Sequence, residues 1–259
     1  MNFPQTKNII RDLALVYYLT KIKIHKEIVS KFFGFVWWLL DPLINMSVLY
    51  IVTALILELR TDDKVVFLLS GLLLFRYMQS SISNSTRSLS PAMSLSSLIY
   101  LPKYVFVIRD IFSEFFKLII GLFVLIILVN IVTSASIQYF EVLFVALTCL
   151  IFCLSLSSIF ANLGIIFPDI SNILGYTFRA LFFLSGIFFD LSRVPAEWQG
   201  VFLSNPFALL IHNMRLALIL PGSIDYASLL ILIAISVTLS AFGFYFLVKL
   251  DRIYPKIVL

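Results

Sequence analysis

Long apolar runs separated by short polar stretches are the dominant pattern of this chain. The runs cover residues 32–57, 65–86, 104–130, 139–167, 171–190 and 225–248. Each is at least as long as the about 20 residues that a membrane-spanning helix requires. The pattern therefore predicts an all-α membrane protein with six transmembrane helices. No internal repeat or Gly/Ser-rich linker divides the chain, so residues 1–259 are expected to form one domain.

A different pattern separates the fifth and sixth runs. Residues 195–218 are too broken by proline and charge to cross a bilayer, yet too apolar for a solvated loop. Irregular backbone at membrane depth is tolerated only against protein or beside a water-filled cavity. This segment is therefore predicted to form re-entrant helices that act as a gate. The residues singled out for the gate are Pro195, Trp198, Asn205, Pro206 and Arg215.

The N-terminal segment, residues 1–31, has the periodicity of an amphipathic helix. Apolar and basic positions between residues 5 and 28 fall on different sides of a helical wheel. Two interpretations are open and compatible. The helix lies on the inner leaflet as an interfacial helix, or it docks on a partner protein.

A polar segment, residues 84–100, joins the second and third runs. Pro91 suits the first turn of a helix and Pro102 suits a stop, so a short amphipathic helix is expected between them. Such a cytoplasmic helix would give a cytosolic partner a mechanical handle on two spans. A plain loop is the alternative.

Composition and charge fix the class of protein and its orientation. The chain is 61% hydrophobic and 13% charged, with a mean hydropathy of +1.05, which indicates an integral membrane protein. Its net charge is +5, and the first 31 residues carry six Lys or Arg against two acidic residues. The positive-inside rule then places the N-terminus in the cytoplasm. Six crossings of the cytoplasmic (inner) membrane return the chain to the same side, so the C-terminus is predicted to be cytoplasmic as well. Isoleucine and leucine interleave with these lysines, which favours a membrane surface over nucleic acid.

No constellation in the sequence indicates an enzyme. The nucleotide-binding pattern G-x-x-x-x-G-K-[ST] is missing from the sequence, and His25 and His212 are far apart with no metal-ligand spacing around them. Cys149 and Cys153 lie inside an apolar run and are expected to pack as small hydrophobic side chains. We therefore expect no catalytic residue, cofactor or metal in this chain.

Charged residues inside the apolar runs are more informative. Arg76 and Arg179 each lie about ten residues from the end of a predicted span. An arginine facing lipid there would cost about 2.5–3.5 kcal/mol, so each should face a cavity or an acidic partner, for example Asp41. Two interpretations remain open at this point: a structural ion pair, or a cationic lining for a substrate bearing phosphate or sugar.

A further set of charges begins the third span. Asp110, Glu114 and Lys117 fall on one helical stripe, with Glu114 and Lys117 placed to pair at i,i+3. The stripe either faces a cytoplasmic vestibule or is only a set of salt bridges at the membrane interface. The 40 aromatic residues, 26 of them Phe, exceed what interfacial belts need and would suit a sugar channel, although core packing is the default for any one of them.

Five motifs in this order resemble the ABC-2 family of ATP-binding-cassette exporter permeases, over essentially the whole chain. They are Phe33-Gly-Phe-Val-Trp-Trp-Leu-Leu-Asp-Pro42-Leu, Leu69-Ser-Gly-Leu-Leu, Leu184-Ser-Gly-Ile-Phe with Val194-Pro195, Asn205-Pro206-Phe, and Arg215. Within the family they look like subunits that export O-antigen, capsular polysaccharide or teichoic acid. Leu74-Phe75 replaces a Pro-Trp pair often found in the family, and Arg76 follows it. Leu101-Pro-Lys103 replaces a frequent Phe-Pro-Arg.

The resemblance implies a homodimeric permease that works with two copies of a separate ATPase subunit, which binds the ATP and magnesium. Its substrate would be a polyprenyl-diphosphate-linked glycan that threads between the two permeases. By the same resemblance, the interfacial helix maps onto 8–25, the coupling helix onto 87–98 and the external gate onto 195–218. The coupling residues expected to meet the ATPase are Arg87, Ser90, Pro91, Met93, Leu95 and Leu98.

Our hypothesis from the sequence is therefore a transport subunit of a polysaccharide exporter. The residues expected to contact substrate or line the vestibule are Arg76, Tyr77, Arg179, Trp37 and Trp38. An exporter of a small drug or lipid is the alternative within the family. A membrane-embedded enzyme acting on polyprenyl lipids is the alternative from another class. It predicts paired Asp or His at the membrane surface, whereas the acidic residues are scattered singly apart from Asp62-Asp63 in a predicted outer loop.

Overall fold

The computed structural model describes residues 9–51, 64–96, 101–132, 136–219 and 223–251. Within these ranges the regular elements are all helical, which confirms the all-α prediction. The α-helices are α1 (Ile9–Val29), α2 (Trp37–Ile51), α3 (Lys64–Ser96), α4 (Lys103–Val132), α5 (Tyr139–Ile166), α6 (Ile170–Leu184), α7 (Ala196–Leu203), α8 (Pro206–Leu218) and α9 (Tyr226–Lys249). One-turn 3₁₀ helices, η1 (Gly34–Val36) and η3 (Leu191–Arg193), precede α2 and α7.

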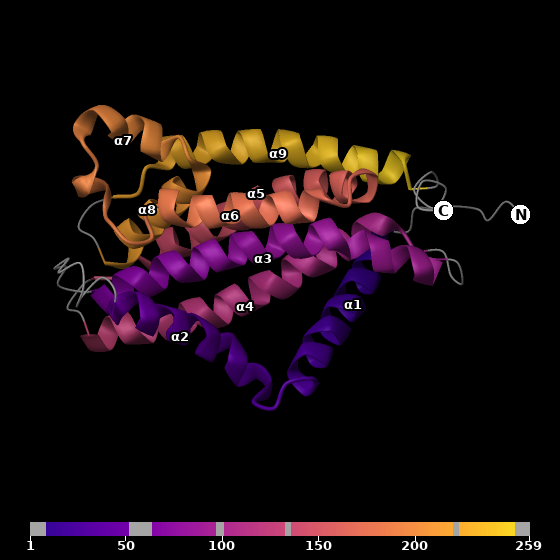
Figure 1. Cartoon of the computed structure of the whole chain (residues 1–259), viewed down its shortest axis with the longest axis horizontal. Coiled ribbons are helices and arrows are strands. Elements are labelled where there is room, and N and C mark those ends of the chain that lie inside the picture. Colours follow the sequence, from indigo (N-terminus) through magenta and orange to yellow (C-terminus); the bar gives the residue numbers. More distant parts are fainter. Residues whose placement is uncertain (1–8, 52–63, 97–100, 133–135, 220–222, 252–259) are drawn as a thin grey trace, which may run out of the picture.

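Helix α3 is the centre of the bundle. It contacts α2, α4, α5, α6 and α8, whereas α9 packs mainly along α5 at the edge of the molecule (Figure 1). In the most apolar stretch of α3, 78% of the residues are buried, against 17% in α9. A soluble protein would not leave α9 so exposed and so apolar, and the lipid-facing role explains both properties.

Two glycines allow the central helices to approach closely. A Cβ atom at Gly164 of α5 would overlap the backbone carbonyl of Thr86 in α3. A Cβ atom at Gly243 of α9 would likewise overlap Ser158 of α5. Small residues at such crossings bring backbones together, which is how helices gain packing energy in a membrane that offers no hydrophobic driving force between them.

In the described part of the chain, four helices are long and apolar enough to cross a bilayer. They are Val65–Leu89, Lys103–Ile131, Tyr139–Ile166 and Tyr226–Lys249, and they match the second, third, fourth and sixth predicted spans. The bent pair α7–α8 adds a fifth if it is counted as one span. The first and fifth predicted spans correspond to α2 and α6, each of which has 15 described residues. Six full-length spans are thus not confirmed.

Helix α6 is shorter than the predicted span 171–190 because its last residues do not continue the helix. The chain leaves α6 at Ser185, and Gly186 takes a left-handed φ of 69°. Glycine just beyond a helix in this conformation is a strong stop signal, since it has no Cβ to strain. The apolar residues after Gly186 therefore extend the run without extending the helix. The end of the first predicted span, residues 52–57, lies outside the described residues.

The segment between the second and third spans also differs from prediction. Helix α3 runs without a break from Lys64 to Ser96, so Pro91 lies inside it and does not begin a new short helix. Proline removes one helical hydrogen bond, and here the loss falls within the last two turns, where the helix has few bonds left to break. The continuation of α3 to Ser96 replaces the separate short helix that we expected, and Leu98 lies outside the described residues.

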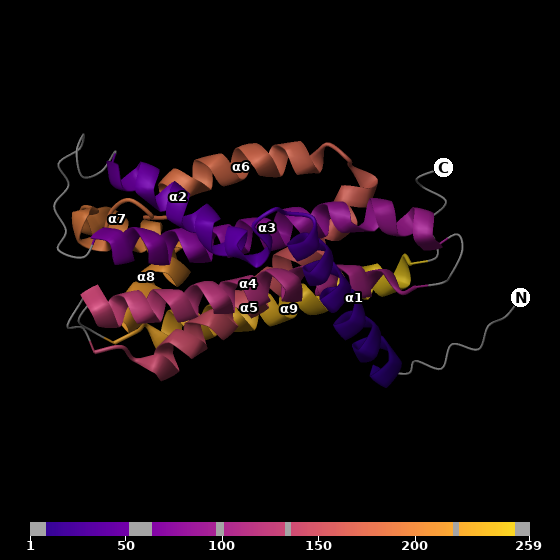
Figure 2. The same ribbon diagram turned by 90° about the horizontal axis from the view of Figure 1, so that it is seen from below.

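Helix α1 confirms the predicted N-terminal helix. It runs obliquely to the bundle and meets α2 in a V at residues 30–36 (Figure 1). It packs mainly against α4. Seen from below, α1 crosses the bundle while α2 and α6 flank one side of α3 (Figure 2). Two cavities lie along α3, one among α1, α2, α3 and α4 and one between α2, α3 and α6.

Candidate functional site

Two polar cavities lie against α3. The first encloses about 210 Å³ and is lined by residues of α1, α2, α3 and α4 together with Lys31: Glu27, Lys31, Trp38, Asp41, Leu73, Arg76, Tyr77, Ser80, Asn84, Glu114, Lys117 and Leu118. The second encloses about 330 Å³ between α2, α3 and α6 and is lined by Asn45, Leu72, Phe75, Arg76, Gln79, Ser80, Ser83, Asn84 and Phe182. Arg76, Ser80 and Asn84 line both, so one face of α3 forms the wall that the cavities share.

Arg76 forms the ion pair predicted from the sequence. Its Nη2 atom lies 2.7 Å from Oδ2 of Asp41 in α2. The two side chains are 44% and 34% exposed. The pair therefore joins α2 to α3 in a partly open place, which satisfies the requirement that a charge at this depth find a partner or a cavity.

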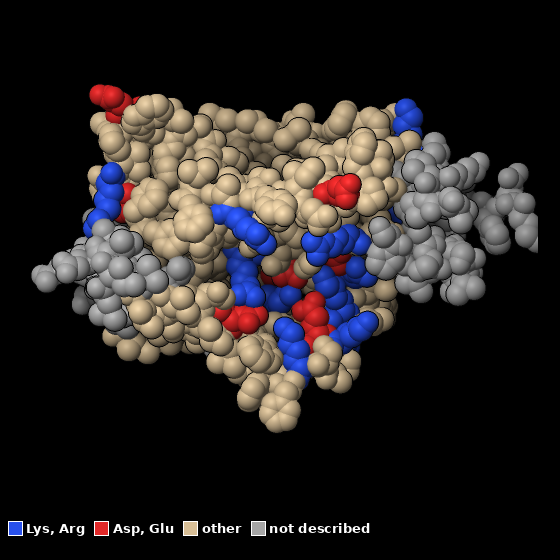
Figure 3. Space-filling view, viewed as in Figure 1, with Lys and Arg blue, Asp and Glu red and all other residues tan. Residues whose placement is uncertain are grey.

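The wall of the first cavity formed by α1 and α4 is a set of salt bridges. Lys117 lies 2.7 Å from Glu114, the predicted i,i+3 pair, and 2.9 Å from Glu27 of α1. Lys23 of α1 lies 3.0 Å from Asp110. Lysines, arginines and acidic residues gather on this face of the molecule (Figure 3). The charged stripe on α4 thus binds α1 through salt bridges. The sequence predicted the stripe but not its partners on α1, Lys23 and Glu27.

The aromatic residues expected at the site divide into two groups. Trp38 lines the first cavity, packs edge-on against Phe116 and has the Nζ atom of Lys117 5.8 Å from its ring centre. Tyr77 lines the same cavity and is buried. Trp37, by contrast, packs edge-on against Phe33 and lines neither of the two cavities.

Arg179 also lies apart from these cavities. It is exposed on α6, 5.4 Å over the ring of Tyr176, and no ion pair joins it to an acidic residue in the described part of the chain. The structure therefore brings together Arg76, Tyr77 and Trp38 and leaves Arg179 and Trp37 elsewhere.

The predicted gate is a sharply bent helix pair. Helices α7 and α8 meet at 104° across a short break. Asn205 caps α8: its side chain accepts a hydrogen bond from the backbone N–H of Phe207 and donates to the carbonyl of Leu184 at 3.3 Å. Pro206 occupies the first turn of α8, where its missing N–H is harmless. Pro195 precedes α7, and Trp198 of that helix is 60% exposed.

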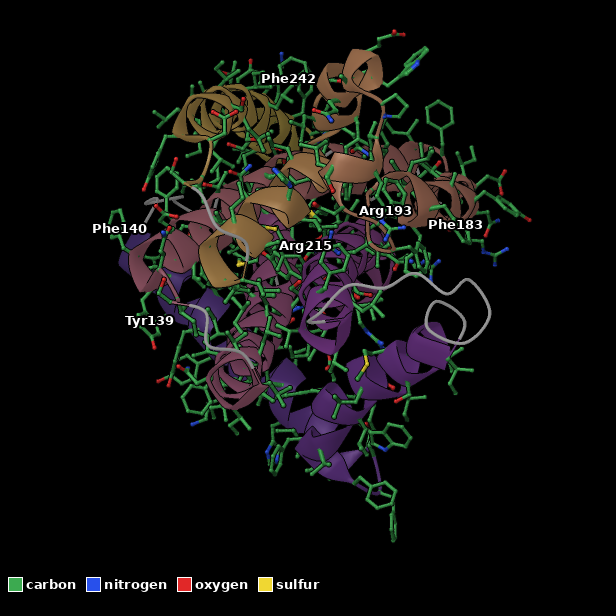
Figure 4. All side chains as sticks on the ribbon, turned by 90° about the vertical axis from the view of Figure 1, so that its left-hand side faces the viewer. Tyr139, Phe140, Phe183, Arg193, Arg215 and Phe242 are labelled. Carbon is green, nitrogen blue, oxygen red and sulfur yellow. The ribbon has the colours of Figure 1, made fainter. Side chains whose placement is uncertain are left out.

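Arg215 ties the end of α8 to the rest of the bundle. Its guanidinium donates to the carbonyl oxygens of Gly186 at 2.7 Å, Ile187 at 2.9 Å and Phe67 at 3.1 Å. It also lies 3.4 Å from the ring centre of Phe67, and only 2% of the residue is exposed. An end-on view places Arg215 within the bundle and Arg193 and Phe183 toward its margin (Figure 4). Arg215, which we predicted to be a gate residue, thus fixes α8 to α3 and to the loop after α6.

The predicted coupling residues lie at the C-terminal end of α3, except for Leu98. Arg87 is exposed on α3, and the residues from Ser90 to Leu95 continue that helix. A second anchor holds the same end of the bundle: Lys103, at the start of α4, donates to the carboxylate and the carbonyl of Asp251 at 3.0 and 2.7 Å. Both side chains are buried.

Metal chemistry finds no support in the described residues. No group of three or more His, Cys, Asp or Glu is placed there to hold an ion. Cys149 and Cys153 are free thiols buried in α5, in agreement with the packing role expected for them.

Comparison with known proteins gives relatives but no family model, since none matches the chain. The O-antigen export system permease protein RfbA of Klebsiella pneumoniae is 22% identical over 249 residues, which are 95% of this chain and 95% of the relative. The polysialic acid transport protein KpsM of Escherichia coli is 27% identical over 228 residues, 81% of this chain and 84% of the relative. RfbA of Myxococcus xanthus is 22% identical over 170 residues, 65% of each chain.

These relatives confirm the resemblance predicted from the five motifs. The similarity runs through nearly the whole chain, so it includes α1, both cavities and the bent pair α7–α8. The chain is therefore similar to multi-pass permeases of polysaccharide export systems, and its long apolar helices agree with that class.

Proposed function

We propose that this chain is the transmembrane subunit of an ATP-driven exporter that moves a polyprenyl-diphosphate-linked polysaccharide, an O-antigen or related surface glycan, across the cytoplasmic membrane. Relatives named for O-antigen export and polysialic acid transport support the substrate class. The sequence has no P-loop, so ATP hydrolysis falls to a separate ATPase subunit. Two ATPase copies and a homodimer of this chain complete the proposed assembly.

The observation that carries the proposal is the cavity between α2, α3 and α6. Its polar lining consists of amide and hydroxyl side chains, namely Asn45, Gln79, Ser80, Ser83 and Asn84, with Arg76 beside them. Phe75 and Phe182 face the same space. Amides and hydroxyls exchange hydrogen bonds with sugar hydroxyls, and aromatic rings pack on the apolar faces of sugar rings. The cavity therefore fits a glycan better than an apolar drug.

The bent helix pair α7–α8 supports the proposal of a gate at one end of the bundle. Helices α7 and α8 lie at the end of the bundle where α6 ends and α9 begins (Figure 1). A segment that leaves and returns at the same end is re-entrant, and irregular backbone there is sheltered by protein. We assign residues 195–218 to the external side and both termini to the cytoplasm, on the charge bias of the first 31 residues.

The opposite end of α3 supports a contact with the ATPase. The helix extends to Ser96, beyond the Val65–Leu89 stretch that is apolar enough to span, and Arg87 is exposed near the end of that stretch. A rigid helix that leaves the membrane transmits movement of a bound subunit to the cavity wall formed by the same helix. Segment 84–100 is therefore the proposed coupling element.

The two alternatives are less well supported. An exporter of a small drug or lipid shares the architecture, but the relatives named here handle polysaccharides. A polyprenyl-lipid enzyme is the alternative from another class, and the relatives named here are export and transport proteins.

Loss of the chain from its host tests the proposal. We expect surface glycan to disappear and lipid-linked glycan to accumulate inside the cell, as measured by surface labelling and by extraction of the lipid-linked pool. Re-expression should restore export, and Arg87→Glu should restore it poorly while leaving protein in the membrane. Arg193→Glu, an exposed arginine near the gate, is the matched control and should restore export fully. Normal surface glycan in the deletion strain would rule the function out.

A further inference from the structure

The ion pair between Arg76 and Asp41 differs from the other ion pairs of the bundle. Lys117 is held by two carboxylates, and the pair of Lys103 with Asp251 is buried. Arg76, in contrast, has a single contact between one guanidinium nitrogen and one carboxylate oxygen, and both side chains are at least one-third exposed. Half-exposed pairs of this kind are weak. The contact is therefore one that a better anion can replace.

The cavities give the two partners unequal access. Arg76 lines both cavities, whereas Asp41 lines only the first. An anion in the second cavity, between α2, α3 and α6, thus reaches the guanidinium from the side that Asp41 does not occupy. A guanidinium presents several N–H groups in a planar fork, which a phosphate fills with two hydrogen bonds where Asp41 fills one.

The pair is also an ionic link between α2 and α3. Within the described residues it is the single ion pair that joins α2 to another helix. The apolar side chains of Leu43 and Met46 pack against the core, whereas Ile44, Val48 and Ile51 face outward and are exposed. Breaking the pair therefore removes the ionic link between α2 and α3 and leaves α2 held mainly by apolar contacts, which allow it to shift along the second cavity.

We propose that Asp41 occupies the place of the substrate's diphosphate in the resting protein, and that the diphosphate displaces it from Arg76 and frees α2 to move away from α3. This inference rests on the proposed function and adds a mechanism of substrate recognition to it. Released Asp41 retains cationic neighbours, because Lys31 and Lys117 line the first cavity with it. The exchange replaces one anion by another at Arg76 and leaves no buried charge unpaired.

Inorganic pyrophosphate is the probe, with the full-length protein in nanodiscs of neutral lipid. Asp41→Asn removes the competing carboxylate and should tighten pyrophosphate binding about fivefold, the factor that corresponds to the upper range of an exposed ion pair. Arg76→Gln should abolish binding, alone and combined with Asp41→Asn. The charge swap Asp41→Arg with Arg76→Asp rebuilds the pair with reversed polarity, so it should keep the fold and change pyrophosphate binding. Arg193→Gln is the matched arginine control and should bind as wild type.

A second measurement follows the helices. Distances between spin labels at Val48 of α2 and Phe183 of α6 should lengthen when pyrophosphate is added to wild type, and should already be longer in Asp41→Asn. Unchanged binding in Arg76→Gln, or no tightening in Asp41→Asn, would overturn the proposal. Saturation of the site by anionic phospholipid in the disc, with no further effect of pyrophosphate, would assign Arg76 to a lipid headgroup and would also overturn it.

The outcomes separate this inference from the proposed function. If the deletion strain loses its glycan while Arg76→Gln exports normally, the exchange is wrong and the exporter stands. If the deletion strain keeps its glycan while the purified chain shows the expected pyrophosphate response, the exporter is wrong and Arg76 is an anion site of a different system.

Discussion

Two arginines of this chain illustrate two ways of placing a cation within a membrane bundle. Arg215 is 2% exposed and donates to three backbone carbonyl oxygens. Arg76 is bound to one carboxylate in a cavity wall, and its side chain is 44% exposed. Carbonyls cannot leave without moving the backbone, whereas a carboxylate side chain can turn away. The comparison teaches that the partner, more than depth or charge, separates a structural arginine from an exchangeable one.

The residues around the Arg215 guanidinium also explain two of the sequence motifs. Gly71 of the first Ser-Gly pair lies so close that a Cβ atom there would be 2.8 Å from Nη2 of Arg215. Gly186 of the second pair supplies one carbonyl and adopts a positive φ of 69°. Two motifs that are far apart in the chain therefore form one socket, and the arginine of a third motif fills it.

Replacement of Arg215 by methionine should have the largest effect. It keeps the apolar stem and leaves the carbonyl oxygens of Gly186 and Ile187 without a donor, each at a cost of about 1–3 kcal/mol, whereas that of Phe67 still accepts from Ser70. We expect a loss of at least about 2 kcal/mol in stability, seen as a fall in the yield of monodisperse protein and in its thermal midpoint in detergent. Arg193→Met, at an exposed position near the same gate, should leave both unchanged. A stable Arg215→Met protein would show that its carbonyls find other donors and would remove the contrast with Arg76.

A methyl group at Gly71 tests the socket more gently. Gly71→Ala pushes against a guanidinium that three carbonyls hold in place, and overpacking of this kind typically costs about 1–3 kcal/mol. Gly200→Ala in α7 is the matched control, because nothing lies within 4 Å of a Cβ atom there, and helical alanine should be neutral or slightly stabilising. The difference between the thermal midpoints of the two variants measures how tightly the Arg215 guanidinium is held beside Gly71. Equal midpoints would mean that Arg215 can shift within it.

Much of the fold follows from the sequence because a bilayer constrains the chain strongly. Four predicted spans match α3, α4, α5 and α9, since an apolar run of this length has few other ways to hide. The pairing of Arg76 with Asp41 follows for the same reason, as a charge at membrane depth requires a partner. The end of α6 could have been read from Ser185-Gly186, a stop signal that the surrounding phenylalanines concealed.

The remaining features have no local signal. The partners of Arg215 are backbone carbonyls, and every residue has one, so no side chain marks them. The salt bridge between Glu27 and Lys117 joins residues 90 positions apart, and only the fold brings them together. Arg179 follows the same hydropathy rule as Arg76 yet lies exposed on α6, because the sequence gives the need for a partner without giving the direction in which the helix faces.

Removal of the exposed pair should have the smallest effect on stability and thereby complete the contrast. Arg76→Gln and Asp41→Asn should each change the free energy of unfolding by about 0–1 kcal/mol, because a half-exposed pair gains little over water. The double variant should lie close to either single one, since the second change has no pair left to break. Thermal midpoints of the four proteins in detergent give this cycle directly. A loss in Arg76→Gln as large as that in Arg215→Met would place both arginines in the structural class, and Asp41 could then not yield its place to a substrate anion.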